Sequence, residues 1–260
     1  MGGILGRKIE VITEDGASDW PTFAEKARKL LVNDKVATVF GCWTSASRKA
    51  ALPVFEKENG LLYYPTFYEG LEQSKNVIYT GQEATQQILD GLNWVAKEKG
   101  AKTFYLIGSD YIWPRTSMKI ARKHIENKLG GTVVGEEYAP LGHTQFGSII
   151  NKIRLKKPDV IYAAVVGGSN VAWFKQPKAA GITGAKQTLL TISVTEDEVL
   201  GIASALRRAG TGVIQLISDA YQSTDDELVA HEIELLGRIA TEVGRPLSFT
   251  VQQNDDAPDR

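Results

Sequence analysis

Aromatic and hydroxyl side chains gather where the apolar segments of this sequence end. In LLYYPTFYEG, residues 61–70, an apolar run passes into tyrosines, a threonine and a glutamate. Tyr and Trp rings form stiff walls with one polar tip each, and hydroxyl groups can bond the carbonyl and N–H groups of a small molecule. These residue types predict a binding site for a small polar ligand, and the candidates are Trp43, Ser45, Tyr64, Thr66, Tyr68, Tyr111 and Trp113.

Three glutamates in similar positions are further candidates. The carboxylates of Glu69, Glu196 and Glu198 can accept hydrogen bonds from the N–H groups of an amide. Glu196 and Glu198 can instead complement the dipole at the start of a helix. The Ser and Thr residues of these loops can likewise be helix N-caps, whereas the aromatic residues are not capping residues. Residue types alone leave both interpretations open.

The elements that must position these residues alternate between strand and helix patterns. Short β-rich runs separated by amphipathic helical segments are typical of βαβ units and a parallel sheet. We predict strands at residues 8–13, 35–41, 60–65, 102–108, 132–138, 159–166 and 187–192. We predict helices at residues 20–34, 44–59 with an interruption at Pro53, 86–100, 117–131, 145–157 and 169–181, and a turn at SDYIWPRT, residues 109–116.

Five of the predicted strands run into small, hydroxylic or aromatic residues, in the loops GCWTS, LLYYPT, YLIGSD, AAVVGG and LLTISVT. In open α/β sheets, ligands bind beyond the carboxyl ends of the strands, where such loops gather. The five loops are therefore candidates for one shared site.

Composition and motifs argue against several other functions. A formal net charge of -1 leaves no electrostatic footprint for nucleic acid. The three histidines lack metal-ligand spacing, and there is no GxSxG nucleophile elbow, GxGxxG motif or P-loop. Cys42 is the single cysteine, which rules out an internal disulfide framework. We expect a binding protein that is not an enzyme and that uses neither a metal nor a cofactor.

The segments GCWTSASRKA, LLYYPTFYEG, IGSDYIWPRTS and LLTISVTEDEV carry a family resemblance. Residues 3–202 resemble the urea and short-chain-amide binding proteins of ABC transporters, a branch of the type I periplasmic binding proteins. The resemblance implies two doubly wound parallel-sheet lobes, at residues 1–82 and 83–202, that close on an uncharged amide or urea. It places Trp43, Ser45, Tyr64 and Thr66 on the first lobe's side of the ligand, with Tyr111 and Trp113 on the second.

Residues 203–260 change in character. They resemble a fragment of the amidohydrolases that act on N-acyl-D-amino acids, and they read as one more βαβ unit, which we expect to dock on the second sheet. The sequence therefore looks like a truncated type I periplasmic binding protein with an added C-terminal unit. Because the truncated chain retains a single crossing between lobes, near residues 80–84, we expect weak ligand binding.

The resemblance implies a solute-binding component that works in the periplasm with the membrane subunits of an ABC transporter. No signal peptide is present at the start MGGILGRKIEV, so the chain as written would stay in the cytoplasm. Two alternatives stay open, namely a cytoplasmic amide-sensing regulator and a chimeric fusion without function. A hydrolase has little support because the metal ligands of the amidohydrolases lie outside the resembling fragment.

Overall fold

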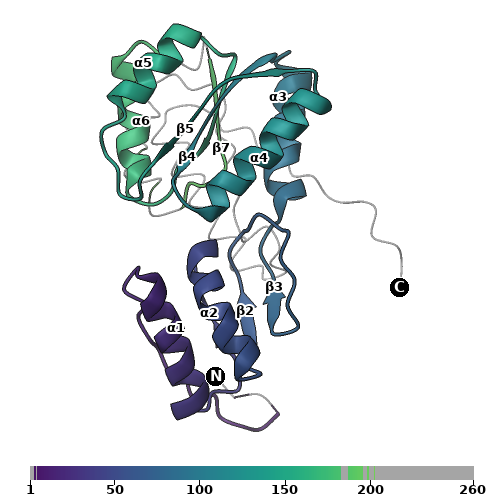
Figure 1. Ribbon diagram of the computed structural model, residues 1–260, viewed down its shortest axis with the longest axis vertical. Coiled ribbons are helices and arrows are strands. Elements are labelled where there is room, and N and C mark those ends of the chain that lie inside the picture. Colours follow the sequence, from purple (N-terminus) through teal and green to yellow (C-terminus); the bar gives the residue numbers. More distant parts are fainter. Residues whose placement is uncertain (1–2, 4, 183–186, 196–197, 199–201, 203–260) are drawn as a thin grey trace.

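The computed structural model describes residues 3, 5–182, 187–195, 198 and 202. These residues form two sheets, which lie in separate halves of the molecule (Figure 1). The first has the strand order β1-β2-β3 and the second β5-β4-β6-β7, and every pairing is parallel. The predicted α/β class with parallel sheets is confirmed for the described residues, and the predicted C-terminal βαβ unit lies outside them.

The first half holds three very short strands and two helices. They are α1 (Trp20–Arg28), continued by the π-helical turn η1 (Lys29–Asn33), β1 (Val39–Phe40), α2 (Ser45–Lys57), β2 (Leu62–Tyr64) and β3 (Val77–Tyr79). Its core is small. Phe55 of α2 packs with Leu62, Tyr64 and Val77 of the sheet, and Ala27 of α1 closes the cluster.

The second half is larger and more regular. It contains η2 (Thr85–Leu89), α3 (Asp90–Glu98), β4 (Thr103–Ser109), α4 (Ile112–Asn127), β5 (Thr132–Ala139), α5 (Gly147–Lys156), β6 (Val160–Ala164), α6 (Ser169–Ala179) and β7 (Thr188–Thr191). Every residue of β6 is buried, as expected for a central strand of a parallel sheet that is covered on both faces.

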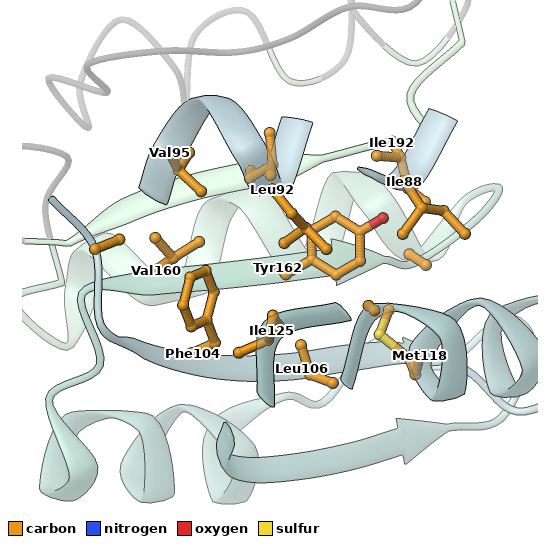
Figure 2. Close-up of a cluster of buried hydrophobic side chains, with 14 of the residues drawn as sticks. Ile88, Leu92, Val95, Phe104, Leu106, Met118, Ile125, Val160, Tyr162 and Ile192 are labelled. Atoms are coloured by element: carbon orange, nitrogen blue, oxygen red, sulfur yellow. The ribbon is translucent and has the colours of Figure 1, made fainter. Parts of the chain in front are cut away.

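Two apolar clusters cover the two faces of the second sheet. On one face, residues of α3 and α4 converge on β4 and β6, as Figure 2 shows for Leu92, Val95, Phe104, Leu106, Met118, Ile125, Val160 and Tyr162. On the other face, Ile149 and Ile153 of α5 and Trp173 of α6 pack against Tyr105 and Ile161. The larger core of the molecule therefore lies in the second half.

Helix α2 begins with a capping box and continues through a proline. The Thr44 hydroxyl accepts a hydrogen bond from the amide of Ser47 at 3.0 Å, and the Ser47 hydroxyl accepts from the amide of Thr44 at 3.2 Å. The predicted interruption at Pro53 is wrong, because α2 runs unbroken to Lys57. Ala51 and Phe55, on either side of the proline, are fully buried, and this packing offsets the lost backbone hydrogen bond.

Three other predictions need correction. Residues 8–13 form no strand, since no described strand pairs with them and Val11 is 81% exposed. Strand β3 was not predicted, although the segment VIY has strong β-propensity. Residues 112–116 were predicted to belong to a turn, yet α4 begins at Ile112, because Pro114 fits the first turn of a helix. Trp113 is thereby helical.

The chain passes from the first sheet to the second through residues 80–84, beside the loop that follows β2. The amide of Thr80 donates to the carbonyl of Tyr64 at 3.0 Å, and the amide of Tyr68 donates to the carbonyl of Gln82 at 2.9 Å. A Cβ atom at Gly81 would lie 2.2 Å from the carbonyl oxygen of Thr66, so only glycine fits here. The predicted lobe boundary at residue 82 falls in this crossing.

Candidate functional site

The predicted ligand-contacting residues lie in three loops at the carboxyl ends of strands. Trp43 lies between β1 and α2, and Ser45 is the first residue of α2. Tyr64 ends β2 and Thr66 follows it. Tyr111 is the N-cap residue of α4, and Trp113 lies in the first turn of that helix. The first of these loops has a strained backbone, because Cys42 has φ 65° in the left-handed region. Helices α2 and α4 are in contact, which brings the first two loops close to the third.

Tyr64 ties two of these loops together. Its side chain is fully buried, and its hydroxyl donates to the carbonyl of Trp43 at 3.0 Å. Burial raises the pKa of Tyr64 to about 12, so the hydroxyl keeps its proton near neutral pH. Its oxygen can still accept a hydrogen bond from a ligand.

Ser45 and Glu69 form the shortest polar contact among these residues. The Ser45 hydroxyl donates to Oε2 of Glu69 at 2.6 Å, and both side chains are buried. Arg48, one helical turn after Ser45, donates from Nη1 to the Ser45 hydroxyl at 3.2 Å and from Nη2 to Oε1 of Glu69 at 3.4 Å. Since each carboxylate oxygen accepts two hydrogen bonds, Glu69 retains acceptor capacity toward a ligand N–H group.

Arg48 is the centre of a buried ionic cluster that sequence reasoning missed. Its Nε donates to Oε1 of Glu72 at 2.6 Å, and its guanidinium lies 4.5 Å from the centroid of the Tyr64 ring and 5.2 Å from that of Tyr68. Lys49 also pairs with Glu72 and lies 3.8 Å from Glu69. Two cations therefore balance two carboxylates, the guanidinium of Arg48 being buried and the ammonium of Lys49 exposed at the edge of the cluster.

Glu72 anchors this cluster to the third strand. The hydroxyl of Tyr79 donates to Oε1 of Glu72 at 2.8 Å. Burial would raise the pKa of Glu72, but hydrogen bonds from Arg48, Lys49 and Tyr79 outweigh it and hold that pKa at about 2. Glu72 is therefore ionised at all ordinary pH values. The only sequence signal for this arrangement was an arginine on the helix after GCWTS and two glutamates in the loop after LLYYPT.

Tyr111 comes to the site from the second half. It is the N-cap residue of α4. Burial raises the pKa of Tyr111 well above its ordinary value, so its hydroxyl also keeps its proton. The ring of Tyr111 lies 6.4 Å from that of Trp113, which in turn lies 4.8 Å from the ring of Phe67 in the loop after β2, so the start of α4 packs beside that loop of the first half.

The other three predicted residues occupy different surroundings. Trp113 is buried in the core of the second half, where its ring lies 4.8 Å from that of Phe67 and 6.4 Å from that of Tyr111. Its indole Nε1 has no hydrogen-bond partner among the described residues. Trp43 is 44% exposed, while Thr66 is buried beside Gly81.

The loops after β6 and β7 bond mainly to each other. The Ser193 hydroxyl donates to the carbonyl of Val165 at 2.6 Å, and the Asn170 amide donates to the carbonyl of Ser193 at 2.9 Å. Glu198 accepts from the amide of Thr195 at 3.1 Å and from Asn170 at 2.8 Å, which favours a local capping role for this carboxylate. Glu196 lies outside the described residues.

Metal sites and membrane spans were also sought in the part of the chain that the structure describes. It holds no group of three His, Cys, Asp or Glu side chains that could bind a metal ion. None of its helices is long and apolar enough to cross a membrane. Burial raises the pKa of Cys42 to about 11, so its thiol stays protonated and behaves as a small apolar group.

Solved structures share the fold of this chain. One is an ABC transporter solute binding protein from R. palustris in complex with 4-hydroxybenzoate, with 24% identity and a TM-score of 0.71, covering 90% of this chain and 63% of that chain. Another is a branched-chain amino acid transporter substrate binding protein from Streptococcus pneumoniae in complex with isoleucine, with 23% identity and a TM-score of 0.70, covering 94% of this chain and 68% of that chain. A leucine binding protein from Thermotoga maritima has 18% identity and a TM-score of 0.73, covering 93% of this chain and 67% of that chain.

The identities to these solved structures are 24% or less, so the likeness shows the shared fold, and this chain spans 63% of the length of the first protein. A family model described as "Periplasmic binding protein domain" matches residues 1–222. The match continues past the boundary predicted near residue 202, while the amidohydrolase resemblance of residues 203–260 stays a prediction. Because the model matches most of its length, the chain belongs to the periplasmic binding protein domain family, a family of binding proteins rather than enzymes.

Proposed function

We propose that this chain binds urea or a short-chain amide between its two halves, as the solute-binding component of an ABC transporter. The observation that carries the proposal is the buried carboxylate of Glu69, held by the Ser45 hydroxyl at 2.6 Å in a loop whose Phe67 packs 4.8 Å from Trp113 of the other half. A buried carboxylate that retains acceptor capacity suits a ligand with N–H donors. The hydroxyls of Tyr111 and Thr66 and the indole N–H of Trp113 are the candidate donors to the ligand carbonyl.

Charge supports a neutral ligand over an acid. Arg48 and Lys49 are balanced by Glu69 and Glu72, so the cluster offers no uncompensated cation for a carboxylate. Two of the solved structures named above are complexes with 4-hydroxybenzoate and with isoleucine, both of which carry a carboxylate. A carboxylate placed against Glu69 would be repelled, because like charges at short range in a buried site are unfavourable. We therefore expect this chain to differ from those proteins in ligand class.

Aromatic walls would complete the site. The buried ring of Tyr64 would form one wall of the site, with the guanidinium carbon of Arg48 stacked 4.5 Å from the ring centroid. The partly exposed ring of Trp43 would form the rim of the site. Closure of the halves over a small uncharged molecule would exclude water and strengthen each hydrogen bond. By family, the closed form would present the ligand to the membrane subunits of a transporter in the periplasm.

An isosteric change at Glu69 that removes its negative charge tests the proposal. Glu69→Gln keeps the shape of the side chain but turns half of its acceptor capacity into donors. Urea affinity measured by calorimetry should fall at least about tenfold, which corresponds to roughly 1.4 kcal/mol. Glu98→Gln on α3 is the matched control, because that carboxylate is half exposed and pairs with Lys97 at 3.5 Å on the surface. Equal urea affinity in both variants would contradict the assigned role of Glu69.

A further inference from the structure

One face of the first sheet carries apolar side chains that remain exposed. Phe40, Tyr63 and Ile78 lie side by side in the parallel register of β1, β2 and β3, and we call them the outer face. The rings of Phe40 and Tyr63 stack with centroids 4.8 Å apart. Phe40 is nevertheless 70% exposed and Ile78 is 42% exposed. The outer face is thus a preformed apolar surface within the described part of the chain.

The opposite face of the same sheet is covered. Leu62, Tyr64 and Val77 point into the core formed with α1 and α2, and both helices lie on the same side of β2 and β3 in Figure 1. Parallel sheets occur almost only with both faces covered. A three-stranded sheet with strands of two or three residues also needs packing for its stability. The outer face therefore lacks a layer that this kind of sheet requires.

Residues 203–260 are the part of this chain that can supply the layer. Their sequence places Leu228, Ile233, Leu236 and Ile239 at helical spacing, so this stretch has an apolar side to bury. The family match continues to residue 222, which ties the start of this segment to the same domain family. The second sheet has no free face for it, since α3 and α4 cover one face and α5 and α6 the other. We propose that residues 203–260 dock on the outer face of the first sheet.

A second copy of the chain is a poorer occupant for this surface. Three strands spaced about 4.8 Å apart, each of two or three residues, present roughly 150 Å². A stable protein interface buries about 800 Å² on each partner. A segment of the same chain needs less contact area, because its tether gives it a high effective concentration at the sheet. Residues 203–260 are also long enough to reach from the second half, since an extended residue spans roughly 3.3 Å.

Disulfide trapping in the full chain tests the docking. In a Cys42→Ser background, Ile78→Cys combined with Leu236→Cys should oxidise to an intramolecular disulfide, detected by mass spectrometry. The matched control combines Leu155→Cys with Leu236→Cys, because Leu155 on α5 is exposed on the second half. We expect a several-fold higher yield for the first pair. Equal yields would overturn the proposal, and so would a disulfide found only between two copies of the chain.

Hydrogen exchange gives a second readout without added cysteines. Phe40→Glu puts a charge on the outer face, and amides of residues 228–239 should then exchange about tenfold faster or more, because the docked state is less populated. Leu155→Glu, the matched control, should leave these amides unchanged. Unchanged exchange of residues 228–239 in the Phe40→Glu protein would contradict the docking.

Discussion

The two halves of this molecule are stabilised in different ways. The second half has strands of up to eight residues and a sheet packed on both faces, with its polar groups near the loops. The first half has strands of two or three residues and a single small core, but it holds the buried Arg48 cluster. The stability of the first half, which carries most of the candidate site, thus depends on ion pairs and hydrogen bonds. The stability of the second half depends on apolar packing. The predictions below test that contrast.

Removing the central cation should have the largest effect. Arg48→Met leaves Glu69 and Glu72 buried with Lys49 as their remaining cation, and breaking a buried pair in this way costs about 3–5 kcal/mol. We expect amides of β2 to lose protection from hydrogen exchange while those of β4 keep theirs. Arg115→Met is the control, because Arg115 pairs with Asp110 at 2.6 Å on an exposed surface, where such pairs are worth less than about 1 kcal/mol. Equal loss of protection in both halves would contradict the contrast.

Acid should weaken the first half before the second. The pKa of Glu72 is about 2 in the folded protein against an ordinary value of 4.5, so folding favours its ionised form. This stabilisation is fully present above about pH 5 and is lost as the pH falls toward 2, a change of about 3 kcal/mol. Thermal unfolding followed from neutral pH downward should show this loss, and Glu72→Gln should flatten the curve. An unchanged pH profile in Glu72→Gln would argue against the role of Glu72.

A single methyl group at the crossing should disturb the site more than the cores. Gly81→Ala places a Cβ atom against the carbonyl of Thr66, and relief of such overlap costs about 1–3 kcal/mol. We expect weaker ligand binding together with a lower melting temperature. Gly147→Ala on α5 is the control, because a Cβ atom there meets no atom within 4 Å. If both alanine variants bound equally well, the crossing would not position the site loop.

The smallest expected effect concerns one hydroxyl group. Tyr64→Phe removes the hydrogen bond to the Trp43 carbonyl, which should cost about 1 kcal/mol of unfolding free energy and lower ligand affinity. Tyr63→Phe, on the outer face, should change neither quantity.

Trp113→Ala is a poor test of the site because Trp113 is a core residue, and its truncation would cost about 3–5 kcal/mol of stability whatever its effect on ligand binding. Tyr111→Phe is the better probe of the second half.

Sequence patterns were most informative where burial is regular. The strand predicted at residues 102–108 matches β4 within one residue at each end. Its continuous apolar run is typical of a central strand that is buried on both faces of a parallel sheet. Residues 8–13 also have a β-rich pattern, but they form no strand because no described strand pairs with them. Arg48 was missed because its partners Glu69 and Glu72 lie in an irregular loop, where no periodicity relates them to α2. Residue type also did not reveal that the ring of Trp113 packs in the core of the second half, and the contact of Trp113 with ligand stays a prediction.

The most direct test of the central claim is calorimetry of the unmodified chain with ligands of two classes. Urea, formamide and acetamide represent neutral molecules with N–H donors, and isoleucine and 4-hydroxybenzoate represent carboxylates. The balanced charge around Glu69 predicts that binding, even if weak, is confined to the neutral amides and that the carboxylates give no heat of binding. Saturable binding of isoleucine or 4-hydroxybenzoate, with none of urea or the amides, would contradict the proposed ligand class.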